Sequence, residues 1–243
     1  MNSKSSARAL DQDPPDDRSG GEHRIPPALA VVLAAVAYAT LPSKIRFGPR
    51  LVVPGLELLL LMALLWTNPL RMNRHTRLSR AVSVVLACLI IAANLTGLGL
   101  LLATLPDEKA SGTALLIGGM QVWLTGVIGF ALLYWELDRG GPVARRRVTR
   151  EELPPADWRF SQDENRETVA EVRASSSETA GWMPTFVDYA YMSLTNSSAF
   201  SPTDTMPLSA RAKCLMGLQA SAALFTSLLV VARAVGSLGG GGG

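Results

Sequence analysis

The sequence lacks the residues from which most enzyme active sites are built. Its 243 residues include only two histidines, His23 and His75, and both lie in polar segments. A histidine-based catalytic triad, a zinc cluster or a haem pair therefore cannot form within an apolar core. A glycine-rich phosphate loop is also missing. We expect a protein that is not an enzyme and that holds no cofactor and no metal.

Cysteine and net charge are equally scarce. The only cysteines, Cys88 and Cys214, lie inside apolar runs, where a thiol is inert and packs or faces lipid. The 23 lysines and arginines nearly balance the 20 acidic residues, which leaves a formal net charge of +3. Short basic loops are the only feature that favours nucleic acid, and membrane topology explains them. No nucleic-acid partner is expected.

Long apolar runs are the dominant feature that is present. Hydrophobic residues make up 48% of the chain, and its mean hydropathy is +0.23. Crossing the hydrocarbon layer takes about 20 apolar residues, or about 17 at the low end. The pattern predicts an all-α polytopic membrane protein in a lipid bilayer, with about five transmembrane helices at residues 26–41, 51–66, 81–105, 112–135 and 208–238.

The remaining residues divide the chain into five parts. Residues 1–25 hold almost no large apolar side chains and are predicted to be a disordered flank. A four-helix region (26–135) and a polar loop (136–181) follow, then a pore-like helix-loop with the final helix (182–238) and a glycine tail (239–243). The loop carries no phosphate, nucleotide or metal motif, so we expect an interfacial anchor, an oligomer contact or a basic patch for anionic lipid headgroups.

Arginines predict the orientation in the membrane. Four of them lie between the second and third runs, and four more follow the fourth run, whereas the connection between the third and fourth runs has only Lys109. By the positive-inside rule, the N-terminus is then cytoplasmic. Three basic residues in the first loop favour the opposite orientation: Lys44, Arg46 and Arg50.

Polar residues inside apolar runs are candidates for function, because lipid tolerates them only where they pair or line water. Glu57 interrupts the second run and predicts either proton or cation binding or a protonated carboxyl bonded to Asn94 or Gln121. In the last run the polar residues recur at seven-residue steps, which places them on one drifting helix face. Either a pore-lining face or a buried helix contact gives this stripe, formed by Gln219, Thr226 and Arg233.

The segment 188–236 has the order of elements found in pore loops. A short aromatic amphipathic run, DYAYMSLT, precedes a polar stretch, NSSAFSPTDTMP, and one long apolar helix. Residues 189–236 resemble the pore helix, filter and inner helix of tetrameric potassium-type ion channels. Ser193 to Thr195 match the end of the pore helix, Pro207 and Leu208 match the start of the inner helix, and 231–236 match its end. The resemblance implies a homo-tetramer and a path for monovalent cations.

The filter itself departs from the channel pattern. Asn196, Ser197, Ser198, Ala199 and Phe200 replace Thr-Val-Gly-Tyr-Gly. Ser198 and Phe200 occupy the glycine positions, which need a positive φ, so a carbonyl-lined potassium filter is not expected. Side chains would be the ligands instead, with neutral oxygens from the asparagine, the serines and Thr203 and a carboxylate from Asp204. Such a constriction predicts a weakly selective cation channel.

Two other functions remain open. The whole chain also resembles an uncharacterised bacterial inner-membrane family known only as a domain of unknown function, which fits a non-conducting structural or regulatory protein with a vestigial channel fold. A proton or small-solute transporter that uses Glu57 is the other alternative. The side of the membrane from which the pore-like loop enters is also open. Three arrangements are possible: an external N-terminus, a loop that enters from the cytoplasm, or a segment 188–200 that crosses part of the bilayer.

Overall fold

The computed structural model describes residues 21–43, 45–67, 77–104, 112–164, 169–198 and 204–239, without the side chains of 67 and 234–239. The chain is mostly helical. Four helices come first and two more form the C-terminal part: α1 (Ile25–Ala39), α2 (Val52–Thr67), α3 (Arg77–Ala103), α4 (Gly112–Leu137), α7 (Phe186–Ser197) and α8 (Ala210–Gly239). All of these helices except α7 lie where the apolar runs predict them.

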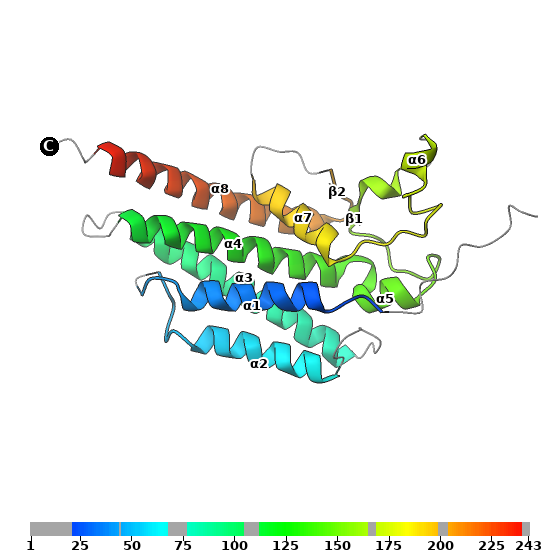
Figure 1. The fold of residues 1–243 in the computed structure, drawn as a ribbon, viewed down its shortest axis with the longest axis horizontal. Helices are drawn as coiled ribbons and strands as arrows, with labels where there is room; N and C mark the ends of the chain where they lie inside the picture. The colour runs from blue at the N-terminus through cyan, green and yellow to red at the C-terminus, as the bar shows by residue number, and fades with distance from the viewer. Residues whose placement is uncertain are drawn as a thin grey trace, which may run out of the picture.

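The first four helices alternate in direction, so that α1 and α3 run one way and α2 and α4 run back (Figure 1). Two prolines occupy the first turn of α1, where the missing N–H costs nothing. The central helix is α4, which contacts α1, α3, α7 and α8. It is also the most buried of the long helices, with 61% of its apolar window inside the protein against 28% for α8. The core therefore forms around α4.

Three of the described helices are long and apolar enough to cross a membrane: α3, α4 with the turn that follows it, and α8. Helices α1 and α2 are apolar too, but they have 15 and 16 residues, just below the length of about 17 needed for a span. The membrane class is supported, whereas the count of five spans stays a prediction. Both cysteines are exposed on long helices, where a membrane would surround them with lipid.

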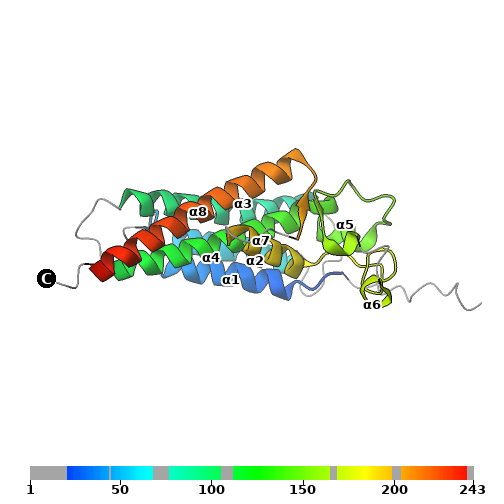
Figure 2. The same ribbon diagram turned by 90° about the horizontal axis from the view of Figure 1, so that it is seen from above.

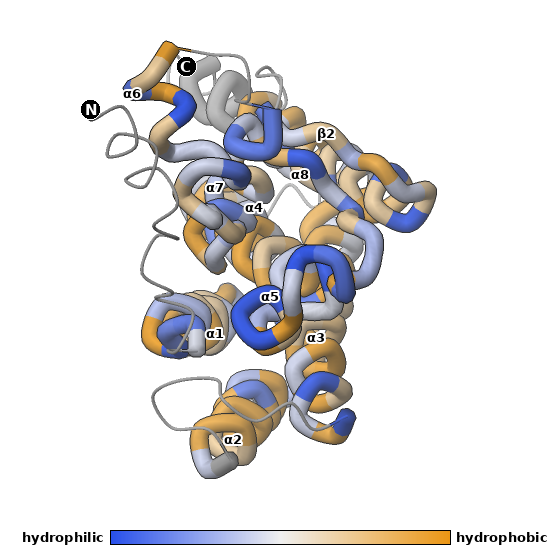
Figure 3. The backbone as a smooth tube through the Cα atoms, turned by 90° about the vertical axis from the view of Figure 1, so that its right-hand side faces the viewer, coloured by the Kyte–Doolittle hydropathy of each residue, from blue (hydrophilic) through white to orange (hydrophobic). Residues whose placement is uncertain are grey.

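The polar segments gather at one end of the bundle, which we call the polar end (Figure 3). It comprises residues 21–24, the segment 138–185 and the start of α8, and the opposite end is called the far end. The described residues of the segment 138–185, which leave out 165–168, form only short elements: a 3-10 turn (Asp138–Gly140), α5 (Pro142–Arg147), β1 (Trp158–Arg159), a 3-10 turn (Ser161–Asp163) and α6 (Ala170–Arg173).

The predicted N-terminal flank ends earlier than residue 25. Glu22 and Arg24 are 7% and 6% exposed, and Glu22 accepts a hydrogen bond from the indole of Trp135 on α4. Residues 1–20 and the glycine tail from 240 lie outside the described residues. The last few residues before α1 thus belong to the packed polar end.

Candidate functional site

Helix α7 lies along α4 and α8 and ends halfway down the bundle (Figures 1 and 2). Thr185 and Asp188 cap its first turn. Near its other end, the hydroxyl of Ser193 donates to the carbonyl of Val127 at 2.7 Å, and the indole of Trp123 donates to the carbonyl of Ser197 at 3.3 Å. Trp123 is near the middle of α4, so the C-terminal end of α7 lies in the middle of the bundle.

The chain then returns to the end from which α7 started. Strand β2 (Met206–Pro207) pairs antiparallel with β1, with Trp158 opposite Pro207 and Arg159 opposite Met206. Helix α8 begins there and runs the whole length of the bundle (Figure 2). Helix α7 therefore runs from the polar end to the middle of the bundle, and α8 begins at the polar end again.

One glutamine on α8 fixes the end of α7. The two N–H groups of the Gln219 amide serve three acceptors, the hydroxyl of Ser193 at 2.6 Å, its carbonyl at 2.9 Å and the hydroxyl of Ser197 at 2.8 Å, so that one N–H is shared. Its amide oxygen accepts from the phenol of Tyr134 at 2.6 Å and from the amide of Asn196 at 2.9 Å. Gln219 is 2% exposed. We call these five residues the Gln219 network.

A small cavity adjoins this network at the end of α7. Its empty space is about 240 Å³, counted to the open mouth, and its walls come from α3, α4, α7 and α8. The enclosed part has room for about one water-sized particle. Neutral polar groups and one indole meet there, supplied by Asn94, Trp123, Ser197, Gln219 and Thr226. Among the described residues no cluster of three or more His, Cys, Asp or Glu could hold a metal.

A second set of polar side chains leads from the cavity to the far end. Asn94 donates to the carbonyl of Val122 and to the hydroxyl of Thr125, the latter at 2.9 Å. Thr125 donates to the carbonyl of Gln121 at 2.8 Å, and the amide of Gln121 donates to the hydroxyl of Thr40 at 2.8 Å. The amide oxygen of Gln121 is buried and has no hydrogen-bond partner among the described residues. We call this set the α4 polar row.

The predicted site residues separate into two groups. Asn196, Ser197, Gln219 and Thr226 meet around the end of α7, and Thr226, like Gln219, is 2% exposed. The polar stripe of α8 thus faces the interior of the same chain at these two positions. The other predicted residues lie elsewhere: Ser198 and Asp204 are exposed, and Arg233 is half-buried two helical turns beyond Thr226. Ala199, Phe200 and Thr203 lie outside the described residues.

Glu57 lies apart from this cavity. It is 1% exposed on α2, and its Oε2 has no hydrogen-bond partner in the described part of the chain. The two side chains expected to bond it, Asn94 and Gln121, donate to groups on α4 and α1 instead. The sequence therefore predicts the burial of Glu57 but gives no correct partner for it.

Sequence reasoning missed three members of the site: Trp123, Tyr134 and Ser193. All three are polar-tipped side chains in or beside an apolar helix, which is the signal that could have found them. Asn94 was noticed only as a possible partner of Glu57. Its polar side chain inside an apolar run indicated a buried contact, but not the helix that makes it.

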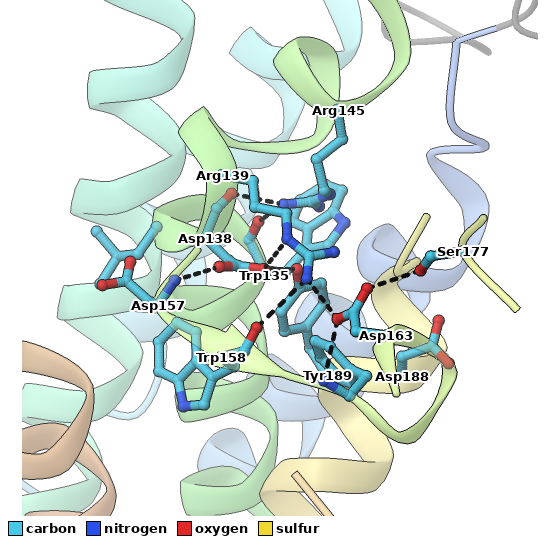
Figure 4. Close-up of polar contacts among 12 residues, drawn as sticks. Trp135, Asp138, Arg139, Arg145, Asp157, Trp158, Asp163, Ser177, Asp188 and Tyr189 are labelled. Carbon is cyan, nitrogen blue, oxygen red and sulfur yellow. Dashed lines mark hydrogen bonds and ion pairs between the residues drawn. The ribbon is translucent and has the colours of Figure 1, made fainter. Parts of the chain in front are cut away.

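The polar end closes the site with a buried charge cluster (Figure 4). Asp138 is fully buried and accepts from the phenol of Tyr189 at 2.5 Å and from the backbone N–H of Asp157 at 2.7 Å. Arg139 forms an ion pair with Asp163 at 2.6 Å, and its backbone has a φ of 50°. A non-glycine residue adopts this conformation at a cost, which the ion pair offsets.

A second arginine extends the cluster to the N-terminal residues. Arg145 donates to the carbonyls of Trp135 and Asp138, at 2.9 Å each, and its guanidinium lies 5.0 Å from the ring centre of Tyr189. Its Nη2 is 3.7 Å from the carboxylate of Glu22. Burial raises the pKa of the Glu22 carboxyl, and the Arg145 charge offsets part of that rise.

The outer carboxylate of the cluster behaves differently. Burial alone would raise the pKa of Asp163, but a hydrogen bond from Ser177 and the charge of Arg139 outweigh it, so that this pKa lies below its ordinary value. Asp157 is held by Ser209 and Arg211 at the start of α8. The cluster therefore ties the ends of α4, α7 and α8 to one another.

Comparisons with protein-family models, with curated proteins and with solved structures give no match for this chain. The resemblance of residues 189–236 to a channel pore module stays a prediction. What the site does must follow from the chemistry of its own side chains.

Proposed function

We propose that this membrane protein binds a small monovalent cation, or its hydration water, in the cavity at the end of α7 and passes it across the bilayer with weak selectivity. The observation that carries the proposal is the position of this cavity. A helix that stops in the middle of a membrane-type bundle ends there beside a small cavity whose walls are partly polar and partly apolar. Discontinuous helices of this kind supply ion sites in transporters.

The electrostatics of the helix end favour a cation. The last carbonyl groups of a helix carry the negative end of its dipole, and the cavity adjoins that end of α7. The surrounding side chains of Asn94, Ser197 and Thr226 are neutral. Neutral oxygens attract a cation without a carboxylate and distinguish poorly between sodium and potassium, so weak selectivity is expected.

The α4 polar row supports a route to the far end. It continues the polar groups from Asn94 to Thr40 through the half of the bundle that α7 does not reach. In the other direction the aromatic side chains of Trp158, Tyr134 and Tyr189 are all fully buried, and the ring of Trp158 packs on Tyr134, which bonds Gln219. The arrangement thus fits a closed state that must open at the polar end before an ion can pass.

The positive-inside rule and the arrangement of the helices support cytoplasmic entry. Helix α7 starts at the end that carries the arginines of α5 and the first residues of α3, which the rule assigns to the cytoplasm. The proposed loop therefore enters from the side opposite to that of a potassium channel. A tetramer stays a prediction, and the proposal does not require one because one chain supplies all the cavity walls.

A non-conducting structural or regulatory role is the second candidate, and the Gln219 network favours it. All five hydrogen bonds of Gln219 are made within the chain, so this residue has little capacity left for a passing ion. On this alternative the network only anchors α7. Glu57 supports a third function, proton or solute transport, less strongly because it lies outside the cavity.

Ion flux separates these functions. We expect the protein in liposomes to pass sodium and potassium faster than protein-free liposomes do, and Thr226→Val, which removes a cavity hydroxyl, to change that flux at least several-fold. Ser221→Ala is the matched control, because both hydroxyls bond the carbonyl four residues earlier but Ser221 is exposed. If the folded wild-type protein passes no ions, the structural or regulatory role is the candidate that remains. Flux abolished only by Glu57→Gln would favour the transporter.

A further inference from the structure

The arginines at the polar end differ in whether a carboxylate neutralises them. Four of them form ion pairs in the loop segments or at the start of α8: Arg139 with Asp163, Arg145 with Glu22, Arg159 with Glu164 and Arg211 with Asp157. The opposite charges of such a pair cancel at a distance, because each partner attracts what the other repels. The charges of this part of the polar end therefore largely balance.

Three other arginines at this end have no such partner. Arg77 is the first residue of α3, and Arg146 and Arg147 are the last residues of α5. Within the described parts of the chain, none of the three forms a hydrogen bond or an ion pair. Arg77 and Arg147 are exposed, and Arg146 is half-buried. The charge of Arg146 acts on Glu22, but that carboxylate is already paired with Arg145. We call Arg77, Arg146 and Arg147 the basic rim.

The two parts of the basic rim lie on neighbouring segments. Arg80, one turn after Arg77 on α3, donates to the carbonyl of Glu136 at 3.4 Å. A β-carbon on Gly141, the residue before α5, would lie 3.8 Å from the Nε of Arg80. Figure 3 looks onto this end of the bundle and shows α5 as a hydrophilic segment beside α3. The start of α3 and the short helix α5 therefore form one basic surface.

The basic rim lies where the headgroups of a bilayer would be. Helix α3 has 27 residues, which gives it a length of about 40 Å against a hydrocarbon layer of about 30 Å. When α3 is centred in that layer, its first turn lies outside it. Trp66, near the end of α2 that reaches the same level, is 89% exposed, which is typical of a tryptophan at the membrane surface.

Carboxylates near the rim are fewer than its arginines. Glu151 and Glu152 follow α5, and both are exposed. The carboxylate of Glu152 accepts a hydrogen bond from the hydroxyl of Thr149 at 2.9 Å. Arg150 precedes both carboxylates and adds a further positive charge. Among the residues that the structure describes here, positive charge is therefore in excess.

We propose that the basic rim binds the phosphate groups of anionic phospholipids, such as phosphatidylglycerol, in the leaflet at the polar end. A guanidinium presents several N–H donors to one phosphate, which makes arginine well suited to this contact. Exposed basic side chains at the membrane surface attract lipids that carry a net negative charge. A zwitterionic headgroup carries a cation beside its phosphate, so it is attracted less. The start of α3 thus belongs to a surface that the sequence assigned to the loop 136–181 alone.

Native mass spectrometry of the full-length protein tests the proposal. The protein in detergent receives equal amounts of phosphatidylglycerol and phosphatidylcholine with the same acyl chains, and the lipids that stay bound are counted. We expect the wild type to retain several-fold more phosphatidylglycerol than phosphatidylcholine. Arg146→Gln combined with Arg147→Gln should lose most of this preference, and Arg77→Gln should lower it.

A second double variant controls for the change in net charge. Arg159→Gln combined with Arg173→Gln removes the same number of charges from β1 and α6, outside the basic rim, and should keep the preference. An equal loss of phosphatidylglycerol in the two double variants would overturn the proposal. So would equal retention of the two lipids by the wild type. Thermal unfolding of each variant confirms that it is folded.

A further measurement separates a lipid from a free anion. Inorganic phosphate carries the same chemical group without acyl chains. Phosphatidylglycerol should raise the unfolding temperature of the wild type in detergent, because a ligand of the folded state stabilises it, and inorganic phosphate at the same concentration should not. An equal rise with inorganic phosphate would mean a site for free phosphate and would contradict the proposal. None of these outcomes depends on ion flux, so the two proposals can fail independently.

Discussion

At the scale of single residues, Gln219 has the most consequences. Its side chain joins α8 to α4 and α7 and leaves no buried donor or acceptor of its own unused. A buried polar group that loses its partner costs about 1–3 kcal/mol. Gln219 therefore helps to hold α7 in the middle of the bundle, together with the bonds from Ser193 to Val127 and from Trp123 to Ser197.

The first prediction follows from that network. Gln219→Leu deprives several buried groups of a partner, so we expect its free energy of unfolding in detergent to fall by at least about 2 kcal/mol. Tyr134→Phe removes one donor and should cost about 0.5–1.5 kcal/mol. Ser221→Ala should leave stability unchanged. Equal stability of all three variants, measured by thermal or denaturant unfolding, would mean that the network does not hold α7.

The lowered pKa of Asp163 predicts how the stability of the fold depends on pH. Its folded pKa lies below the unfolded value of about 3.9, so its charge stabilises the fold above that pH, and the contribution is lost as the pH falls through the folded pKa. Asp163→Asn should therefore be less stable than the wild type at pH 7, by about 1–3 kcal/mol. The difference should shrink below about pH 4. A difference that does not decrease at all as the pH is lowered from 7 into the acid range would contradict the role of this charge.

The sequence predicted the polar residues better than their partners. Gln219 and Thr226 were identified from their seven-residue spacing, and both are buried as that spacing allows. Their environment was not predictable, because periodicity says which residues share a face and not which helix covers it. The charge cluster was missed for a related reason: Asp138, Arg139 and Tyr189 are ordinary loop and helix residues until the fold brings them together.

At the scale of elements, α7 is the decisive segment. Its buried face packs on α4 and α8, while Val187, Tyr191 and Leu194 on its other face are exposed. The hydroxyl and amide of Thr185 donate to the carboxylate of Asp188, at 2.8 Å and 2.7 Å, which caps the first turn. A helix of 12 residues is marginal alone, so its cap and its packing must both contribute.

A change in the cap should therefore loosen α7 selectively. Thr185→Ala is expected to cost about 0.5–2 kcal/mol of stability. Amide hydrogen exchange should quicken across 186–198 and stay unchanged in α4, because the loss is confined to the first turn of α7. Thr195→Ala, further along the same helix, serves as control. Faster exchange over the whole protein would show instead that α7 has no separate stability.

Apolar run length predicted the long helices to within a few residues but could not predict the path of the chain after α4. The two-residue strands β1 and β2 are too short to have a sequence pattern, yet they return the chain to the polar end. Without this strand pairing, the three arrangements that the sequence leaves open for the pore-like segment cannot be distinguished. Which path is taken depends on contacts between residues about 50 positions apart.

At the scale of the whole molecule, the main consequence is an orientation. If the polar end is cytoplasmic, exposed residues at the two ends must lie on opposite sides of the membrane. In a Cys88→Ser, Cys214→Ser background, we expect Ser175→Cys to react with a membrane-impermeant maleimide only from the cytoplasm. Ser43→Cys should react only from the other side. Labelling of both positions from one side would contradict the topology.

The central claim is that the cavity at the end of α7 holds a monovalent cation, and the dependence of the unfolding temperature on cations tests it most directly. A ligand that binds only the folded state stabilises it by mass action. Replacing choline chloride by sodium or potassium chloride at constant ionic strength should raise the unfolding temperature of the wild type and of Ser221→Ala but not of Thr226→Val. The same unfolding temperature in all three salts would contradict the claim.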